Sequence, residues 1–352
     1  MVRKLIFEVR EKKITAKEIL YNDIYVKNSF DMEVILSSFG AGIKSIKIKD
    51  KDGKLKEMTL CPEDEDLFYF VYHGKTIGRT SGRIKDATFS LDGKVAHLDK
   101  NNFNTDNLHG GKEGLNRKNF TYKVSSLKDH LDVIFTYFSK DQEGGYFGNV
   151  NIKVTYRIFD FENKIQIIYD ATSDCKTLLN LTNHAYFNLS GDPFICANGQ
   201  RLYIAASKYG ALSKNLIVED IVPVTKEMDF RTPHLIKDYI DEASLHQVTN
   251  GYDHPYFLDK PGLDYLAAKL YSKESGIALE VRTTYPCVIF YSNSKSNKPF
   301  IVNGVDYSLL SACCLECQFH PDGIHQEKER NGVFSQDNPY HEVIEYSFFV
   351  EG

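Results

Sequence analysis

The chain has 352 residues, 42% hydrophobic content and a net charge of −5, so it can bury a large core. Its charges form no basic stripe that would neutralise phosphates, which excludes nucleic acid as an expected partner. The first twenty residues are interrupted by charge, and no segment reaches the roughly 18 unbroken apolar residues of a membrane span. These features predict a cytoplasmic protein that has no membrane partner.

The seven cysteines are an odd number scattered through a long chain, which predicts reduced thiols rather than a disulfide framework. Cys314 and Cys317 form a C-x-x-C, but no second pair stands at a zinc-binding spacing. His320 and His325 flank Pro321, which disfavours a helix that presents both imidazoles on one face. We therefore expect no bound metal and interpret the two cysteines as small strand residues.

The predicted elements are mostly strands joined by tight turns. Gly40 and Gly42 mark a turn that opens onto a strand over residues 43–48. They do not form a dinucleotide-binding fingerprint, because a third glycine and a following helix are lacking. Asp52-Gly53 and Asp92-Gly93 each lie between alternating runs, which is the strongest short-range signal for a β-hairpin.

Alternation of apolar and polar residues is clearest over residues 152–158 and 165–169, which a D-F-E-N turn separates. Helical periodicity is nearly absent, and a short helix is expected only within residues 233–249. No linker, repeat or low-complexity tract divides the chain. The sequence thus predicts one all-β domain over residues 1–352, a large antiparallel β-sandwich with few short helices.

Signatures of phosphate-binding loops and of nucleophile elbows are absent from the sequence. Five short polar strings remain, and each alone is typical of an ordinary loop or core residue. They are G-R-T-S-G-R-I at 78–84, N-L-H-G-G at 107–111, L-T-N-H-A-Y-F-N-L at 181–189, G-Y-D-H at 251–254 and C-L-E-C-Q at 314–318.

Together and in this order, the strings resemble the aldose 1-epimerase (galactose mutarotase) family over nearly the whole chain. T-N-H-x-Y-F-N-L is the most specific of them, and L-E-C-Q followed by Pro321-Asp322 is the next. The resemblance implies the antiparallel supersandwich of galactose mutarotase with an open carbohydrate cleft. It also implies an isomerase that acts on a free aldohexose such as galactose or glucose.

The resemblance assigns Glu316 as the general base and His184 as the general acid. A cyclic aldose changes anomer when a base takes the C1 hydroxyl proton and an acid protonates the ring oxygen, so the ring opens and recloses. This chemistry needs no cofactor and no metal. Nearby carboxylates are expected to keep His184 protonated. By the same resemblance the sugar is bound by Arg83, His109 and Asp253.

Two positions depart from the family pattern or vary within it. Gly82 stands where the family usually has Asn, which removes one side-chain hydrogen bond or lets backbone approach the sugar. Tyr285 falls where the family varies, and it is a candidate for stacking on a sugar face or an ordinary strand tyrosine.

Three alternatives stay open at this stage. The chain can be a non-catalytic sugar-binding or regulatory homologue, although it retains both Glu316 and His184. It can be a hexose-6-phosphate 1-epimerase that holds the phosphate through Lys112, Arg117 and Lys118. It can also be a glycosidase that uses Asp253 and Glu316 as its carboxylate pair. A monomer and a homodimer both fit the sequence.

Overall fold

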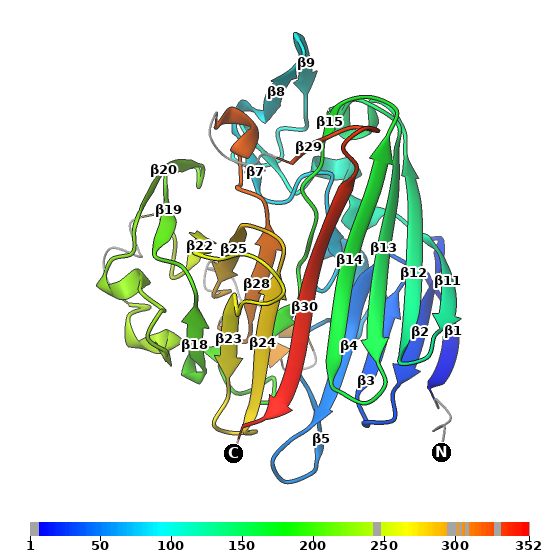
Figure 1. The fold of residues 1–352 in the computed structure, drawn as a ribbon, viewed down its shortest axis with the longest axis vertical. Helices are drawn as coiled ribbons and strands as arrows, with labels where there is room; N and C mark the ends of the chain where they lie inside the picture. Colours follow the sequence, from blue (N-terminus) through cyan, green and yellow to red (C-terminus); the bar gives the residue numbers. More distant parts are fainter. Residues whose placement is uncertain are drawn as a thin grey trace.

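The computed structural model describes residues 7–241, 248–293, 310–326 and 332–351, together with the backbone of residues 301–302 and 305–306. Antiparallel strands dominate these residues, as the sequence predicts, and they form three large sheets (Figure 1). No helix among the described residues is long and apolar enough to cross a membrane.

The largest sheet has nine strands, and every neighbouring pair in it is antiparallel. Its order is β11 (Thr121–Ser126), β12 (His130–Ser139), β13 (Val150–Phe159), β14 (Lys164–Ser173), β30 (Tyr340–Val350), β24 (Ile277–Thr283), β23 (Ala268–Tyr271), β18 (Arg201–Ile204) and β21 (His234–Leu235).

Two smaller antiparallel sheets complete the sandwich. The five-stranded sheet has the order β1 (Glu8–Ala16), β2 (Ile19–Lys27), β3 (Glu33–Ser37), β4 (Gly42–Lys49) and β5 (Leu55–Glu57). The six-stranded sheet has the order β17 (Tyr186–Phe187), β28 (Cys313–Gln318), β25 (Cys287–Tyr291), β22 (Asp253–Phe257), β19 (Lys208–Leu212) and β20 (Val218–Pro223).

Short elements connect the sheets and carry several loops near the candidate site. The paired short strands are β6 (Thr76–Ile77) with β16 (Thr182–Asn183), β7 (Arg83–Ile84) with β10 (Asn107–Leu108), β8 (Thr88–Leu91) with β9 (Lys94–His97), β15 (Thr177–Leu178) with β29 (Val333–Phe334), and β26 (Ile301–Val302) with β27 (Val305–Asp306). The described 3₁₀ turns are η1 (Lys85–Ala87), η2 (Gly111–Glu113), η3 (Leu115–Arg117), η4 (Glu143–Gly145), η5 (Ala197–Gly199), η6 (Lys226–Met228), η7 (Ile236–Asp238) and η8 (Gly323–His325).

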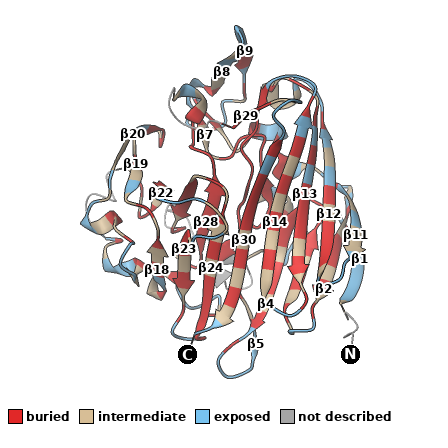
Figure 2. Cartoon of the chain, in the orientation of Figure 1, coloured by how far each residue is buried: buried red, intermediate tan, exposed pale blue. Residues whose placement is uncertain are grey.

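The hairpin predicted from the clearest alternation, around residues 160–163, is confirmed as β13 and β14, with Ile158 opposite Ile165. Alternate residues of both strands are buried, which Figure 2 shows as bands along the strands. The buried face belongs to the same core as apolar residues of β2, β3 and β4, which lie behind the long strands in Figure 1. Burial of alternate Ile and Val side chains thus holds the two sheets together.

The predicted tight turns are also confirmed. Asp52-Gly53 joins β4 to β5, and Asp92-Gly93 joins β8 to β9. Gly53 has φ 76° and Gly93 has φ 78°, a conformation that glycine adopts without steric cost. Gly40 lies in the turn before β4, as expected.

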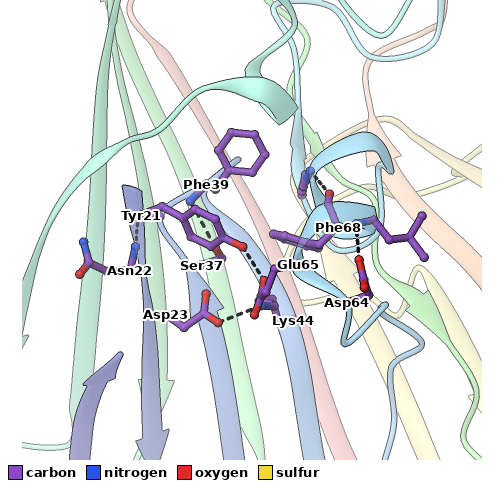
Figure 3. Close-up of polar contacts among 12 residues, drawn as sticks. Tyr21, Asn22, Asp23, Ser37, Phe39, Lys44, Asp64, Glu65 and Phe68 are labelled. Atoms are coloured by element: carbon purple, nitrogen blue, oxygen red, sulfur yellow. Dashed lines mark hydrogen bonds and ion pairs between the residues drawn. The ribbon is translucent and has the colours of Figure 1, made fainter. Parts of the chain in front are cut away.

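The sequence did not predict the short helix α1 (Glu65–Phe70), which follows its N-cap Asp64. Polar contacts fix it to the five-stranded sheet: the Lys44 ammonium lies 2.8 Å from carboxylates of both Asp23 and Glu65, and the Tyr21 hydroxyl donates to Glu65 (Figure 3). Six residues are too few for a helical period to emerge from sequence. Of the helix expected within 233–249, the structure describes only the 3₁₀ turn η7, and residues 242–247 lie outside the described residues.

The seven cysteines all lie within the described residues, and none of them forms a disulfide. Cys314 and Cys317 are buried in β28, which confirms that they are strand residues. Because side chains alternate along a strand, Cys317 points into the main core while Cys314 points toward the opposite face. That opposite face carries the candidate site.

Candidate active site

One face of the six-stranded sheet forms the floor of a small pocket. Glu316 on β28 lies opposite Ile289 on β25, and Asp253 on β22 lies opposite Tyr291. Paired residues of an antiparallel sheet share a face, so these side chains project together. The intervening residues, such as Leu315 and Phe290, enter the main core. Core packing behind the floor therefore fixes the direction in which Glu316 and Asp253 point.

Two short strands place the wall above this floor. Arg83 on β7 pairs with Leu108 on β10, and His109 follows directly. Two hydrogen bonds join Gly82 and His109: His109 N donates to Gly82 O at 3.0 Å, and Gly82 N donates to the imidazole Nδ1 of His109 at 3.3 Å. His109 has φ 55°, a left-handed conformation that turns the chain out of β10. This turn brings its imidazole to the pocket.

His184 enters the pocket from the end of β16 and is 5% exposed. Its ring is nearly parallel to the rings of Tyr186 and Tyr72, whose centroids are 5.0 and 5.9 Å away. The backbone holds it at both ends, because His184 N donates to Lys75 O and Gly74 N donates to His184 O. The aromatic neighbours and the backbone bonds together fix the ring plane.

Both nitrogens of the His184 imidazole have close neighbours on β28. Nε2 lies 3.5 Å from Glu316 Oε1, and Nδ1 lies 3.5 Å from Cys314 Sγ. Burial raises the pKa of the Cys314 thiol well above its usual range, so the thiol keeps its proton and donates to Nδ1. We therefore assign the proton of neutral His184 to Nε2, which faces the carboxylate.

Burial lowers the pKa of His184 to about 4, so its imidazole is neutral in the empty pocket at neutral pH. This opposes the sequence-based expectation of a protonated His184. Burial is the largest cause of the shift, and a hydrogen bond to the backbone of His184 itself opposes it. A mechanism in which His184 acts as an acid must therefore explain how its neutral imidazole becomes protonated.

Arg83 and Asp253 form an ion pair across the pocket, with Nη2 and Oδ2 3.6 Å apart. Burial lowers the pKa of Arg83 to about 10, and the Glu316 carboxylate opposes that shift. Arg83 thus stays charged at neutral pH. The pair supplies fixed donors and acceptors close to the Glu316 and His184 side chains.

Five of the six residues singled out from sequence line this pocket: Arg83, His109, His184, Asp253 and Glu316. Tyr285 does not. Its ring is fully buried, and its hydroxyl lies 2.6 Å from that of Tyr340 inside the core. Residues that sequence reasoning did not single out also line the pocket, among them Tyr72, Tyr186, Tyr291 and Gln318.

The pocket has a volume of about 190 Å³. Pockets for drug-sized ligands measure roughly 300–1,000 Å³, so this one suits a small polar molecule. A larger hollow of about 770 Å³ lies against the five-stranded sheet, but none of the six residues lines it. We assign the site to the smaller pocket, because the acid–base groups converge there.

Among the described residues, His184, Cys314 and Glu316 are grouped closely enough to hold a metal ion, with ligand atoms within 4.8 Å of one another. A metal binds cysteine as the thiolate. Burial raises the pKa of the Cys314 thiol well above its usual range, so without a metal the thiol keeps its proton.

Three antiparallel sheets and a small pocket with a carboxylate beside an imidazole define an all-β protein suited to acid–base chemistry on a small polar molecule. The chain belongs to the aldose 1-epimerase family, because the model of the family described as aldose 1-epimerase matches residues 23–347. It is therefore an isomerase. The family resemblance and the fold class predicted from the sequence are both confirmed.

Two relatives align with this chain over almost their whole length. The chain is 32% identical to the galactose mutarotase of Homo sapiens over 324 residues, which is 91% of this chain and 92% of that protein. It is 30% identical to the aldose 1-epimerase of Escherichia coli over 342 residues, which is 94% of this chain and 96% of that one.

Solved structures agree on the fold. The galactose 1-epimerase of Lactobacillus acidophilus superposes with a TM-score of 0.85 at 23% identity, covering 99% of this chain and 100% of that one. The aldose epimerase homologue of C. elegans superposes with a TM-score of 0.82 at 26% identity, covering 98% and 100%.

Proposed function

We propose that this protein interconverts the α and β anomers of a free aldohexose, such as galactose or glucose, by opening and reclosing the sugar ring. Membership of the aldose 1-epimerase family supports the reaction class. The observation that carries the assignment is the Glu316–His184 pair, with Oε1 and Nε2 3.5 Å apart in a pocket of monosaccharide scale.

The spacing of this pair suits the reaction. The C1 hydroxyl that loses a proton and the ring oxygen that gains one are bonded to the same carbon. A base and an acid that serve both oxygens at once must therefore lie close together. Glu316 takes the hydroxyl proton, and His184 protonates the ring oxygen through Nε2. Reclosure on the other face of the aldehyde reverses both transfers.

The low pKa of His184 sets a condition on this mechanism. A neutral imidazole cannot give up its Nε2 proton without becoming an unstable anion, so His184 must be positively charged when it acts. We propose that the bound sugar provides this condition. It displaces pocket water, which reduces screening of the Glu316 carboxylate and strengthens its attraction for the imidazolium.

Arg83, His109 and Asp253 hold the sugar in this proposal. The Arg83–Asp253 pair presents donors and an acceptor to sugar hydroxyls, and a hydrogen bond to a charged group contributes about 1.5–3 kcal/mol. Tyr285 takes no part, because it lies in the core beside Tyr340.

The alternatives draw less support from the pocket. Among the described residues that line it, Arg83 is the sole lysine or arginine, and Asp253 already pairs with it. Lys118, one candidate for holding a phosphate, instead pairs with Glu113 and Glu143. The pocket lining thus offers a 6-phosphate no cation other than Arg83, although Arg117 is close enough to interact with Tyr72, which lines the pocket. Asp253, the second carboxylate of a glycosidase, is engaged in an ion pair.

Polarimetry tests the proposal directly. Freshly dissolved α-galactose and α-glucose should reach the equilibrium rotation faster with protein than without it. Galactose 6-phosphate serves as the comparison substrate. A sugar that binds without any acceleration of anomer exchange would favour the non-catalytic homologue.

A further inference from the structure

Gln318 lies on the same face of β28 as Glu316 and Cys314, two and four positions before it, and like Glu316 it lines the pocket. Its side chain is fully buried. Neither Nε2 nor Oε1 has a hydrogen-bond partner. It is thus an unpaired amide on the wall of the pocket that holds the acid–base pair.

Neighbouring buried amides differ from Gln318. Asn180 uses both ends, donating from Nδ2 to Phe319 O and accepting from Phe319 N. Asn183 donates from Nδ2 to Gly74 O and to the Tyr156 hydroxyl, while its Oδ1 has no hydrogen-bond partner. Natural folds rarely leave a buried amide unpaired at both ends, because its lost hydration is not recovered. An amide in this state at a pocket wall is matched to a partner that arrives from solution.

Gly82 borders the Gln318 amide. A Cβ at this position would lie 3.2 Å from Gln318 Nε2 and 3.1 Å from Pro321 Cβ, closer than ordinary contacts. Gly82 also has φ +70°, which favours glycine over residues with a side chain. Any side chain at position 82 would therefore press on the amide and on Pro321.

We propose that Gln318 is a specificity-determining residue that binds a hydroxyl group of the sugar, with Oε1 accepting and Nε2 donating. This inference rests on the proposed function, since it takes the ligand to be a sugar. A hydroxyl both donates and accepts, so one hydroxyl or a neighbouring pair can satisfy both ends of the amide. A site built around a substrate hydroxyl discriminates strongly against an analogue that lacks it.

The test is Gln318→Met, which keeps the length of the side chain and removes its polar atoms. Its matched control is Gln200→Met. Gln200 is also buried, but it donates from Nε2 to Asn188 Oδ1 and accepts from Leu189 N outside the pocket. Each variant and the wild type are titrated with 1,5-anhydrogalactitol, which cannot ring-open, and with its deoxy derivatives, while melting temperatures are recorded.

We expect Gln318→Met to weaken binding of the parent ligand about 10–100-fold without lowering the melting temperature. One deoxy derivative should bind wild type and Gln318→Met with nearly equal affinity, because the partner hydroxyl is already absent. Gln200→Met should lower the melting temperature and leave ligand selectivity unchanged. Gln318→Glu keeps the shape of the side chain but loses the Nε2 donors. It should also bind the parent ligand more weakly than wild type does, with nearly equal affinity for the same deoxy derivative.

The inference is overturned if Gln318→Met keeps wild-type affinity for every ligand, or if its affinity loss is the same for all of them. It is also overturned if the variant loses stability as Gln200→Met does, since the amide is then structural. Failure of the proposed function gives a different result. Wild-type protein would then bind these ligands in a Gln318-dependent way but not accelerate anomer exchange.

Discussion

The His184 imidazole should take up a proton when the pocket binds a sugar. With a pKa lowered to about 4 by burial, about one molecule in a thousand carries the imidazolium at pH 7, which corresponds to a cost of about 4 kcal/mol. The Glu316 carboxylate lies 3.5 Å from Nε2. At an effective dielectric constant near 20, that separation gives an attraction of about 5 kcal/mol. The two energies are of similar size, so a stronger attraction in a pocket cleared of water shifts the balance toward the imidazolium.

The perturbation is saturation with 1,5-anhydrogalactitol, and the assay is an NMR titration of the histidine ring nitrogens. We expect the pKa of His184 to rise by about two units or more when the ligand is bound. His184→Asn identifies the signal by its loss. Glu316→Gln should abolish most of the rise, since it removes the charge that favours the imidazolium.

An unchanged pKa near 4 in the saturated protein would refute this reasoning. A rise that persists in Glu316→Gln would also refute it, because the carboxylate would then not be the cause.

Four further predictions concern binding, cofactors and pH. Asp253→Asn should raise KM with a smaller effect on kcat, because it weakens a charged hydrogen-bond acceptor but leaves both proton carriers. A loss of kcat as large as that of Glu316→Gln would contradict the separate roles of the two carboxylates. Activity should survive exhaustive EDTA treatment and dialysis, and restoration of lost activity by one metal would contradict the mechanism. The pH profile of kcat/KM should be bell-shaped, with limbs that belong to the coupled pair, whereas a flat profile would contradict it. Burial lowers the pKa of His73 to about 3 and of His254 to about 4, so the unfolded chain binds protons below pH 6.5 that the folded chain does not. The free energy of unfolding should therefore fall with pH from about 6.5 toward 4, by up to about 1.4 kcal/mol per unit for each histidine, and urea unfolding of His254→Gln should show a shallower slope.

Much of the fold could be predicted from local sequence. The β13–β14 hairpin was readable because each strand buries alternate residues, and the Asp-Gly turns because glycine adopts positive φ without steric cost. α1 was not readable. Its position depends on Lys44, Asp23 and Tyr21, which are distant in sequence, rather than on a helical period.

The candidate site followed from motifs, and the structure brings five of the six residues together in one pocket. Tyr285 stands apart because its neighbour Tyr340 lies far along the chain, so no local pattern reveals that contact. Cys314 and Gln318 flank Glu316 at alternate positions of one strand, and that spacing was a usable signal that they share its face. The protonation state of His184 could not be predicted from the sequence, because it depends on how deeply the ring is buried, and local sequence does not encode that.

The central claim is that Glu316 accepts a proton from the sugar, and turnover of Glu316→Gln tests it most directly. Gln keeps nearly the same shape but cannot accept the C1 hydroxyl proton. Exchange between the α and β anomers at equilibrium should be measured by magnetisation transfer, with ligand affinity determined in parallel. We predict that kcat falls about 10²–10⁴-fold while sugar affinity changes little. Wild-type exchange rates in Glu316→Gln at unchanged affinity would contradict the account.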